Sequence, residues 1–117
     1  MNYFGKGFMV NENFISKRDN SFFRTIDMIR KKCDWFINKH ALDKFSMPFT
    51  QDGYRIKLAK NVKCYNLKGE EIEISDVMST EVTFHFGLRM YNFINNQGQQ
   101  KAGCNIYVNK IEIIQML

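Results

Sequence analysis

The chain has 117 residues, of which 44% are hydrophobic, 15% aromatic and 25% charged, and this composition indicates one globular domain, residues 1–117, and excludes a disordered chain. The net charge is +5, but residues 1–68 carry +8 and residues 69–117 carry −3. A basic half favours an acidic partner such as nucleic acid or an anionic membrane surface, although a solvated surface without a partner explains this modest charge equally well.

The first third of the chain predicts a strand and then a helix. Residues 3–10 alternate between apolar and polar side chains and contain Gly5 and Gly7, which predicts a short, curled strand. A polar connection follows, and Asn20 or Ser21 is expected to cap a helix of about residues 21–40. Six apolar residues at helical spacing form the expected core stripe of this helix: Phe22, Ile26, Ile29, Cys33, Phe36 and Ile37.

Trp35 lies outside that stripe. On a helical projection it shares its side with several cations, namely Arg24, Lys31 and Lys39. We expect Trp35 either to pack against a second side of the core or to contact nucleic acid or a partner protein.

The rest of the chain alternates with a period of two residues and predicts four strands, at about residues 54–67, 70–75, 80–94 and 102–115. Glycine-containing turns at Lys68-Gly69 and at residues 95–100 separate them, and Ser75 is expected to cap a short helical turn. The inward register changes phase near residues 59–60 and 109–110, so we expect β-bulges there.

One helix and five strands joined by short connections predict a mainly β fold. The best match is an oligonucleotide-binding (OB)-like, five-stranded antiparallel barrel. The alternative is an α+β fold in which the helix packs on an open antiparallel sheet.

Cations and aromatic rings share the outward positions of the predicted strands. Single-stranded nucleic acid favours this mixture, because cations track the phosphates and flat rings stack on any base. The candidate binding residues are Arg55, Lys57, Lys63, Tyr65, Arg89, Tyr91, Phe93, Lys101 and Tyr107. The alternative for the aromatic residues is structural: they pack under the helix or form cross-strand pairs.

The sequence offers little for catalysis or for metal binding. No hydrolase, metalloprotease or phosphate-loop motif is present, and Cys104, His85 and Asp76 are grouped only by the expected proximity of their strands. Cys33, Cys64 and Cys104 form no CxxC pair, so we expect free thiols in a reducing compartment, no metal and no cofactor. No signal peptide and no membrane-spanning apolar run is visible, which predicts an intracellular protein without a membrane partner.

Four segments together resemble a known family. They are "TIDMIRKKCDWF", "VKCYNLKGEEIEISDV", "VTFHFGLRMYNF" and "AGCNIYVNKIEII". Their order over residues 26–114 resembles the OB-fold single-stranded DNA-binding proteins of large DNA viruses and some phages. The resemblance implies binding through Arg89, Tyr91, Phe93 and Tyr107, and it implies a packing role for the Trp35-Phe36 pair.

The function expected from these observations is non-catalytic, sequence-nonspecific binding of single-stranded nucleic acid, with DNA expected rather than RNA. The resemblance implies a role in viral or phage DNA replication, recombination or repair, in the host cytoplasm or nucleus if the protein is viral. The alternative is a protein-interaction module such as a small phage or viral inhibitor or assembly factor. Only about 20 residues precede the helix, fewer than is usual in such proteins, so a homodimer that completes the barrel is also expected.

Overall fold

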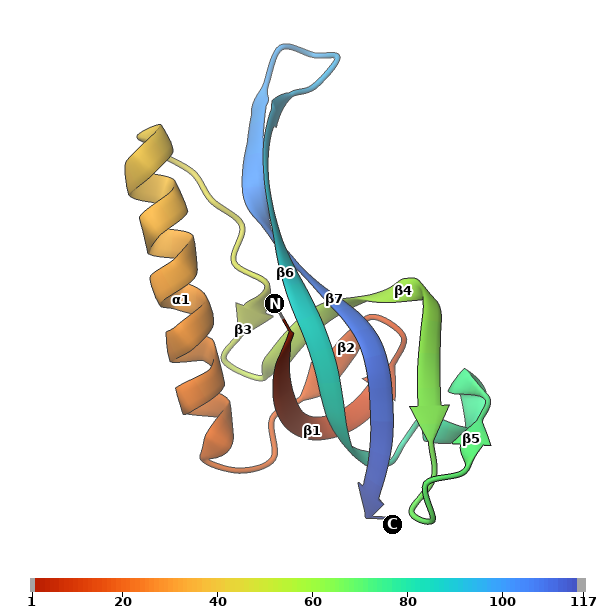
Figure 1. Ribbon diagram of the computed structural model, residues 1–117. Helices are drawn as coiled ribbons and strands as arrows, with labels where there is room; N and C mark the ends of the chain where they lie inside the picture. Colours follow the sequence, from red (N-terminus) through yellow and green to blue (C-terminus); the bar gives the residue numbers. More distant parts are fainter. Residues whose placement is uncertain (1, 116–117) are drawn as a thin grey trace.

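The computed structural model describes residues 2–115, in which one long helix lies against a strongly curled sheet (Figure 1). The elements in chain order are β1 (Tyr3–Asn11), β2 (Phe14–Ser16), α1 (Ser21–His40), β3 (Phe49–Thr50), β4 (Gly53–Tyr65), β5 (Glu71–Ile72), the 3-10 helix η1 (Ile74–Val77), β6 (Glu81–Ile94) and β7 (Gln100–Gln115). The chain is therefore mainly β with one α-helix, as predicted. The short strands β2 and β3 were not predicted, because the sequence there reads as polar connection and turn.

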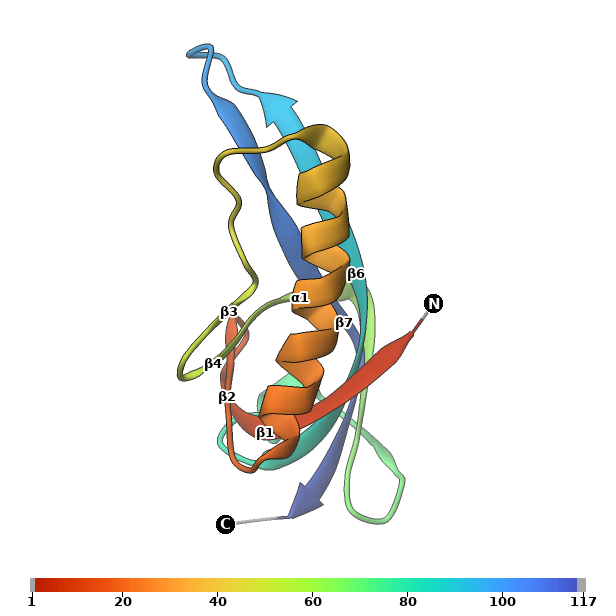
Figure 2. The same ribbon diagram turned by 90° about the vertical axis from the view of Figure 1, so that its left-hand side faces the viewer.

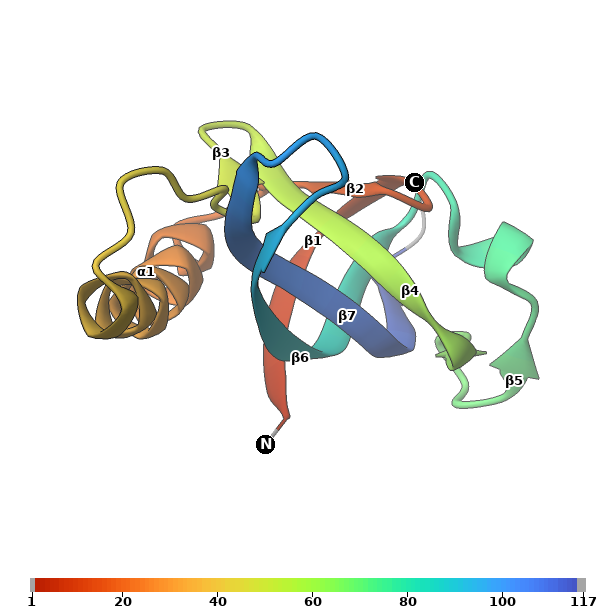
Figure 3. The same ribbon diagram turned by 90° about the horizontal axis from the view of Figure 1, so that it is seen from above.

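Five strands close into a ring, which is seen end-on in Figure 3. The pairing order is β2-β1-β6-β7-β4, and β4 pairs back onto β2 with Phe14 opposite Arg55. The expectation of a wholly antiparallel arrangement is wrong for one of these pairs, because β4 and β7 run parallel. Antiparallel neighbours can be joined by a tight turn, whereas β4 and β7 are separated along the chain by β5, η1 and β6.

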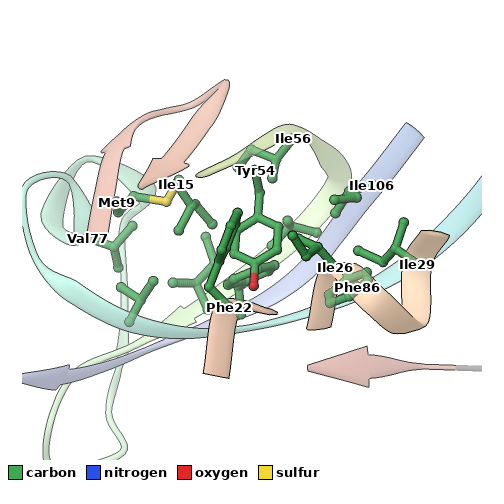
Figure 4. Packing of buried hydrophobic residues seen from close by; sticks show 14 of the residues in the cluster. Met9, Ile15, Phe22, Ile26, Ile29, Tyr54, Ile56, Val77, Phe86 and Ile106 are labelled. Atoms are coloured by element: carbon green, nitrogen blue, oxygen red, sulfur yellow. The ribbon is translucent and has the colours of Figure 1, made fainter. Parts of the chain in front are cut away.

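Side chains from α1 and the inside of the ring form the core (Figure 4). The ring of Tyr54 lies 5.0 Å from Phe22 on the helix and 5.0 Å from Phe84 on β6, both in edge-on contact. Burying an apolar side chain of this size contributes about 1.5–3 kcal/mol, so these contacts fix the helix to the ring. The predicted stripe of α1 is buried at Phe22, Ile26, Ile29 and Cys33, whereas Phe36 and Ile37 are only half-buried.

The two caps differ in detail from the sequence prediction. Asn20 is the N-cap residue of α1, but its side chain makes no capping hydrogen bond. Instead, the Asp19 carboxylate accepts a hydrogen bond from the backbone N–H of Ser21 at 2.9 Å. At η1 the capping pair is Glu73 with Asp76, not Ser75. The sequence pointed to Asn20 or Ser21 for α1 and to Ser75 for η1, and the position of Asn20 is confirmed, but in both places an acidic side chain accepts the free N–H group.

Both predicted irregularities are present. On β4 the pairing with β7 shifts between Leu58 and Lys63, and Figure 1 shows β4 bending sharply in this part of the strand. On β7 the register with β6 shifts around Asn109, since Phe86 pairs with Val108 and His85 with Lys110. The bend in β4 directs its two halves to different sides of the molecule.

The hairpin of β6 and β7 extends beyond the ring as a two-stranded arm, residues 89–105, at the top of Figure 1. Its turn is held by the Asn95 side chain, whose Oδ1 accepts the backbone N–H groups of Gln97 and Gln99, both at 2.9 Å. Gly98 adopts a φ of 74° there, a conformation that favours glycine. The arm therefore has a rigid tip and carries Tyr91 and Phe93 clear of the core.

Candidate nucleic-acid interface

Two adjoining depressions form one groove on the outer face of β4, β7 and β6. The first, of ≈ 440 Å³, is lined by Asn11, Asn13, Phe14, Ser46, Pro48, Arg55, Ile56, Lys57, Tyr91, Cys104 and Asn105. The second, of ≈ 470 Å³, is lined by Lys57, Arg89, Tyr91, Phe93, Lys101, Asn105 and Tyr107. Lys57, Tyr91 and Asn105 belong to both, so we treat the two depressions as a single groove.

Tyr91 lies between the two halves of the groove. It faces Gly103 across the β6–β7 pair, and a Cβ atom on Gly103 would lie 2.4 Å from the Tyr91 hydroxyl oxygen and 2.7 Å from Cζ. The ring therefore lies over the backbone of β7 at a position where only glycine leaves room. Ser46 bridges to the same glycine, and its carbonyl oxygen would lie 2.9 Å from that Cβ atom.

Arg89 and Tyr107 form the second half of the groove together with Lys57. The Arg89 guanidinium carbon lies 5.0 Å from the centre of the Tyr107 ring, a cation–π contact that holds both side chains in place. Lys57 is directly opposite Tyr107 in the β4–β7 register, and Arg89 is directly opposite Asn105 in the β6–β7 register. Two positive charges and an aromatic ring thus come from three neighbouring strands.

Phe93 and Lys101 extend the groove along the arm, where they are paired across β6 and β7. Phe93 is 53% exposed, and its ring centre lies 5.9 Å from that of Tyr91. The two rings are tilted rather than stacked on each other, so each keeps a face for another flat group. Neither shares the groove with a residue of α1, which rules out packing under the helix, whereas Tyr91 does pack across the strand pair, on Gly103.

Arg55 lies in the groove but is engaged in holding its wall. Its Nη2 donates to the Ser46 hydroxyl at 3.1 Å and to the backbone carbonyl of Met47. Ser46 is in turn tied to β7, because its N–H donates to Ala102 and its carbonyl accepts from Cys104. Arg55 therefore positions the segment around Pro48 and contributes its charge to the groove from there.

Lys63 and Tyr65 are the two candidate residues that the structure does not bring to the groove. They follow the bend in β4, where Lys63 pairs with Glu71 at 3.4 Å and Tyr65 lies under the Lys110 ammonium at 5.6 Å. The period-two reading placed them with Arg55 and Lys57 because it treats the strand as straight. The other seven candidate residues all line the groove.

The groove also contains residues that the sequence did not indicate. The amides of Asn11 and Asn13 and the ring of Phe14 line its first half, together with Asn105, whose outward register on β7 the sequence already indicated. The position of the other three depends on β2 folding back beside β4. No acidic side chain lines either half of the groove among the described residues. The groove is consequently a cationic surface with stacking faces and amide hydrogen-bonding groups.

The possible Cys-His-Asp grouping is not assembled. Cys104 is opposite Met90 rather than His85, His85 contacts Glu112 at 2.7 Å, and Asp76 caps η1. The Cys104 thiol is hydrogen-bonded with Cys33 and is buried, and both effects raise its pKa. A protonated, buried thiol is a poor nucleophile. In residues 2–115 no cluster of three potential metal ligands occurs, and α1 is too polar to cross a membrane.

Trp35 is not packed against a second side of the core. It is 64% exposed, and the Lys39 ammonium lies 4.8 Å from its ring centre. The packing role implied for Trp35 by the family resemblance is therefore wrong, whereas its neighbour Phe36 does contact Phe45, with ring centres 6.1 Å apart.

The closed ring, its strand order and its single helix define an OB-like fold. Among solved structures, the chain is similar to gp2.5, a single-stranded DNA binding protein encoded by bacteriophage T7, with a TM-score of 0.58 and 16% sequence identity. The match covers 99% of this chain and 92% of that chain. It confirms the predicted fold class and the distant resemblance to OB-fold single-stranded DNA-binding proteins, and at this identity it establishes the fold alone. No family model and no curated protein matches the chain.

Proposed function

We propose that the chain binds single-stranded DNA in its groove, without sequence preference and without catalysis, during phage or viral DNA replication, recombination or repair. The observation that carries the proposal is the convergence of three cations, Lys57, Arg89 and Lys101, with four aromatic rings on one groove. Among residues 2–115 no acidic side chain lines this groove. The similarity in fold to a phage single-stranded DNA binding protein supports it.

Binding proceeds by electrostatic capture followed by stacking. Lysine and arginine displace counterions from the phosphates, which supplies most of the nonspecific affinity and makes it dependent on salt. Tyr91 and Phe93 then stack on bases, each contributing roughly 1–3 kcal/mol whatever the base. Because the Tyr91 ring is confined over Gly103, little of its side-chain freedom is lost on binding.

Two charge-matched double variants test the groove directly. Lys57→Ala/Arg89→Ala removes two positive charges from the groove, and Lys63→Ala/Lys110→Ala removes two from the far side of the bend in β4. Affinity for a labelled poly-dT oligomer is measured by fluorescence anisotropy over a range of salt concentrations. The groove variant is expected to reduce the slope of log K against log salt by about 1.4, since each lost phosphate contact accounts for roughly 0.7.

The control variant is expected to retain the wild-type slope. Equal losses in the two folded double variants would show that net charge, and not the groove, governs binding, and would overturn the site. The homodimer predicted from the sequence is a separate proposal, tested by the mass that light scattering measures with and without the oligomer.

A further inference from the structure

A third depression, separate from the two that form the groove, lies on the opposite face of β6. Its lining is both apolar and cationic. It has a volume of ≈ 420 Å³ and is lined by Lys31, Lys32, Trp35, Phe36 and Met90. Figure 2 shows α1 lengthwise in front of the sheet, and the depression lies between the second half of this helix and β6. Its largest exposed side chain is Trp35.

The helix face around Trp35 is rich in cations. At about 100° per residue, Arg24, Lys31, Lys32 and Lys39 all project within roughly 60° of Trp35. The two acidic residues of α1 lie further round the helix, where Asp27 pairs with Lys31 at 3.3 Å and Asp34 lies about 100° from Trp35. Lys32 lies 5.4 Å from the ring of Tyr3. The face therefore combines an exposed flat ring with an excess of positive charge.

This face is continuous with the groove across the edge of the arm. Arg89 and Tyr91 point into the groove, and Met90, between them in the chain, points into the depression beside Trp35. β1 pairs with β6 only as far as Phe86, so in residues 2–115 the outer edge of β6 has no strand partner from Gly87 onward. Only the thickness of one strand separates the two surfaces.

We propose that single-stranded DNA longer than the groove crosses the free edge of β6 and continues onto the α1 face, where a base stacks on Trp35 and lysines contact the phosphates. The inference rests on the proposed function of the groove. A DNA strand fits this face better than a protein, because a polyanion held in the adjoining groove reaches the lysines at high effective concentration. The exposed face of an indole ring also accepts any base.

Trp35 is the single tryptophan of the chain, so its intrinsic fluorescence reports on this surface alone. Poly-dT oligomers of about five and about sixteen nucleotides bracket the site sizes of OB folds. Both are titrated into the full chain, with binding measured independently by anisotropy of labelled oligomers. The long oligomer is expected to quench the fluorescence, and the short one is expected to bind without quenching it.

A pair of variants on the same helix completes the test. Trp35→Ala is expected to weaken binding of the long oligomer by about five- to 150-fold, the loss of one stacked base, and to leave the short one unchanged. Phe23→Ala, at the other end of α1 and also exposed (56%), serves as the matched control and is expected to change neither affinity.

The outcomes separate the two proposals. If the long oligomer binds without changing Trp35 fluorescence, and Trp35→Ala binds it as tightly as the wild type, the extended path is wrong. The proposed function of the groove is unaffected by that result, and a protein partner becomes the alternative occupant of the α1 face. If neither oligomer binds, the proposed function fails and the extended path fails with it.

Discussion

Substitution of Gly103 tests how the groove holds its central ring. In Gly103→Ala the new Cβ would meet the Tyr91 hydroxyl at 2.4 Å, Tyr91 Cζ at 2.7 Å and the Ser46 carbonyl oxygen at 2.9 Å. Real Cβ atoms do not approach this closely, and the Ser46 carbonyl is fixed by its bond from Cys104. The Tyr91 ring must therefore swing away from β7, out of its place between the two halves of the groove.

The expected loss follows from the role of that ring. If Tyr91 no longer offers its face to a base, binding of single-stranded DNA should weaken by about 1–3 kcal/mol, or roughly five- to 150-fold in Kd. Crowding at the site should also lower the free energy of unfolding by about 1–3 kcal/mol. Anisotropy of a labelled poly-dT oligomer measures the first quantity, and chemical denaturation followed by circular dichroism measures the second.

Gly87→Ala is the matched control, because it adds the same methyl group to β6 at a position with no atom within 4 Å of the new Cβ. It should leave affinity unchanged. A folded Gly103→Ala protein that binds poly-dT as tightly as the wild type would refute the reasoning, since the position of the Tyr91 ring would then be irrelevant to binding.

Three further predictions concern stability and reactivity. Hydrogen bonds from the side chain and backbone of Ser21 lower the pKa of Asp19, so the stabilising effect of the Asp19 carboxylate is complete above about pH 3.9 and is lost as the pH falls through the lowered pKa of the folded state. Unfolding of Asp19→Asn should therefore depend less on pH in this acidic range than unfolding of the wild type, and identical pH profiles of the two proteins would contradict the cap. Within residues 2–115 the buried Tyr54 hydroxyl has no hydrogen-bond partner. Tyr54→Phe should therefore keep the free energy of unfolding within about 1 kcal/mol of the wild type or raise it, whereas a loss of several kcal/mol in a denaturant titration would reveal a hydrogen bond to this hydroxyl. Burial raises the pKa of Cys64 to about 11, so Cys64 in the native protein should be alkylated more slowly than a free thiol, as measured by mass spectrometry. Alkylation of Cys64 at the rate of a free thiol would show that burial does not protect it.

The sequence was sufficient for the parts of the fold that depend on local periodicity. The alternation Val82, Phe84, Phe86 gave the inward face of β6, and all three are buried. The phase change near Asn109 gave the bulge in β7, because an extra residue is the simplest way to keep apolar side chains on one face.

The rest depends on how distant segments meet. The sequence placed Lys63 and Tyr65 with the other candidate residues because alternation does not reveal that β4 bends between Leu58 and Lys63. Nothing in the sequence indicated that Ser46 and Pro48 would line the groove, since this depends on the bonds of Ser46 to β7. Trp35 could not be placed either, because a helical projection shows which side a residue is on but not whether a neighbour covers it.

The central claim is that this chain binds single-stranded DNA, and one titration tests it most directly. Anisotropy of a labelled poly-dT oligomer is measured against increasing concentrations of the full chain at low salt, alongside a duplex of the same length. Tighter binding of the single strand is expected, with log K falling linearly as log salt rises. Absence of single-strand binding at low salt, or equal affinity for the duplex, would contradict the account.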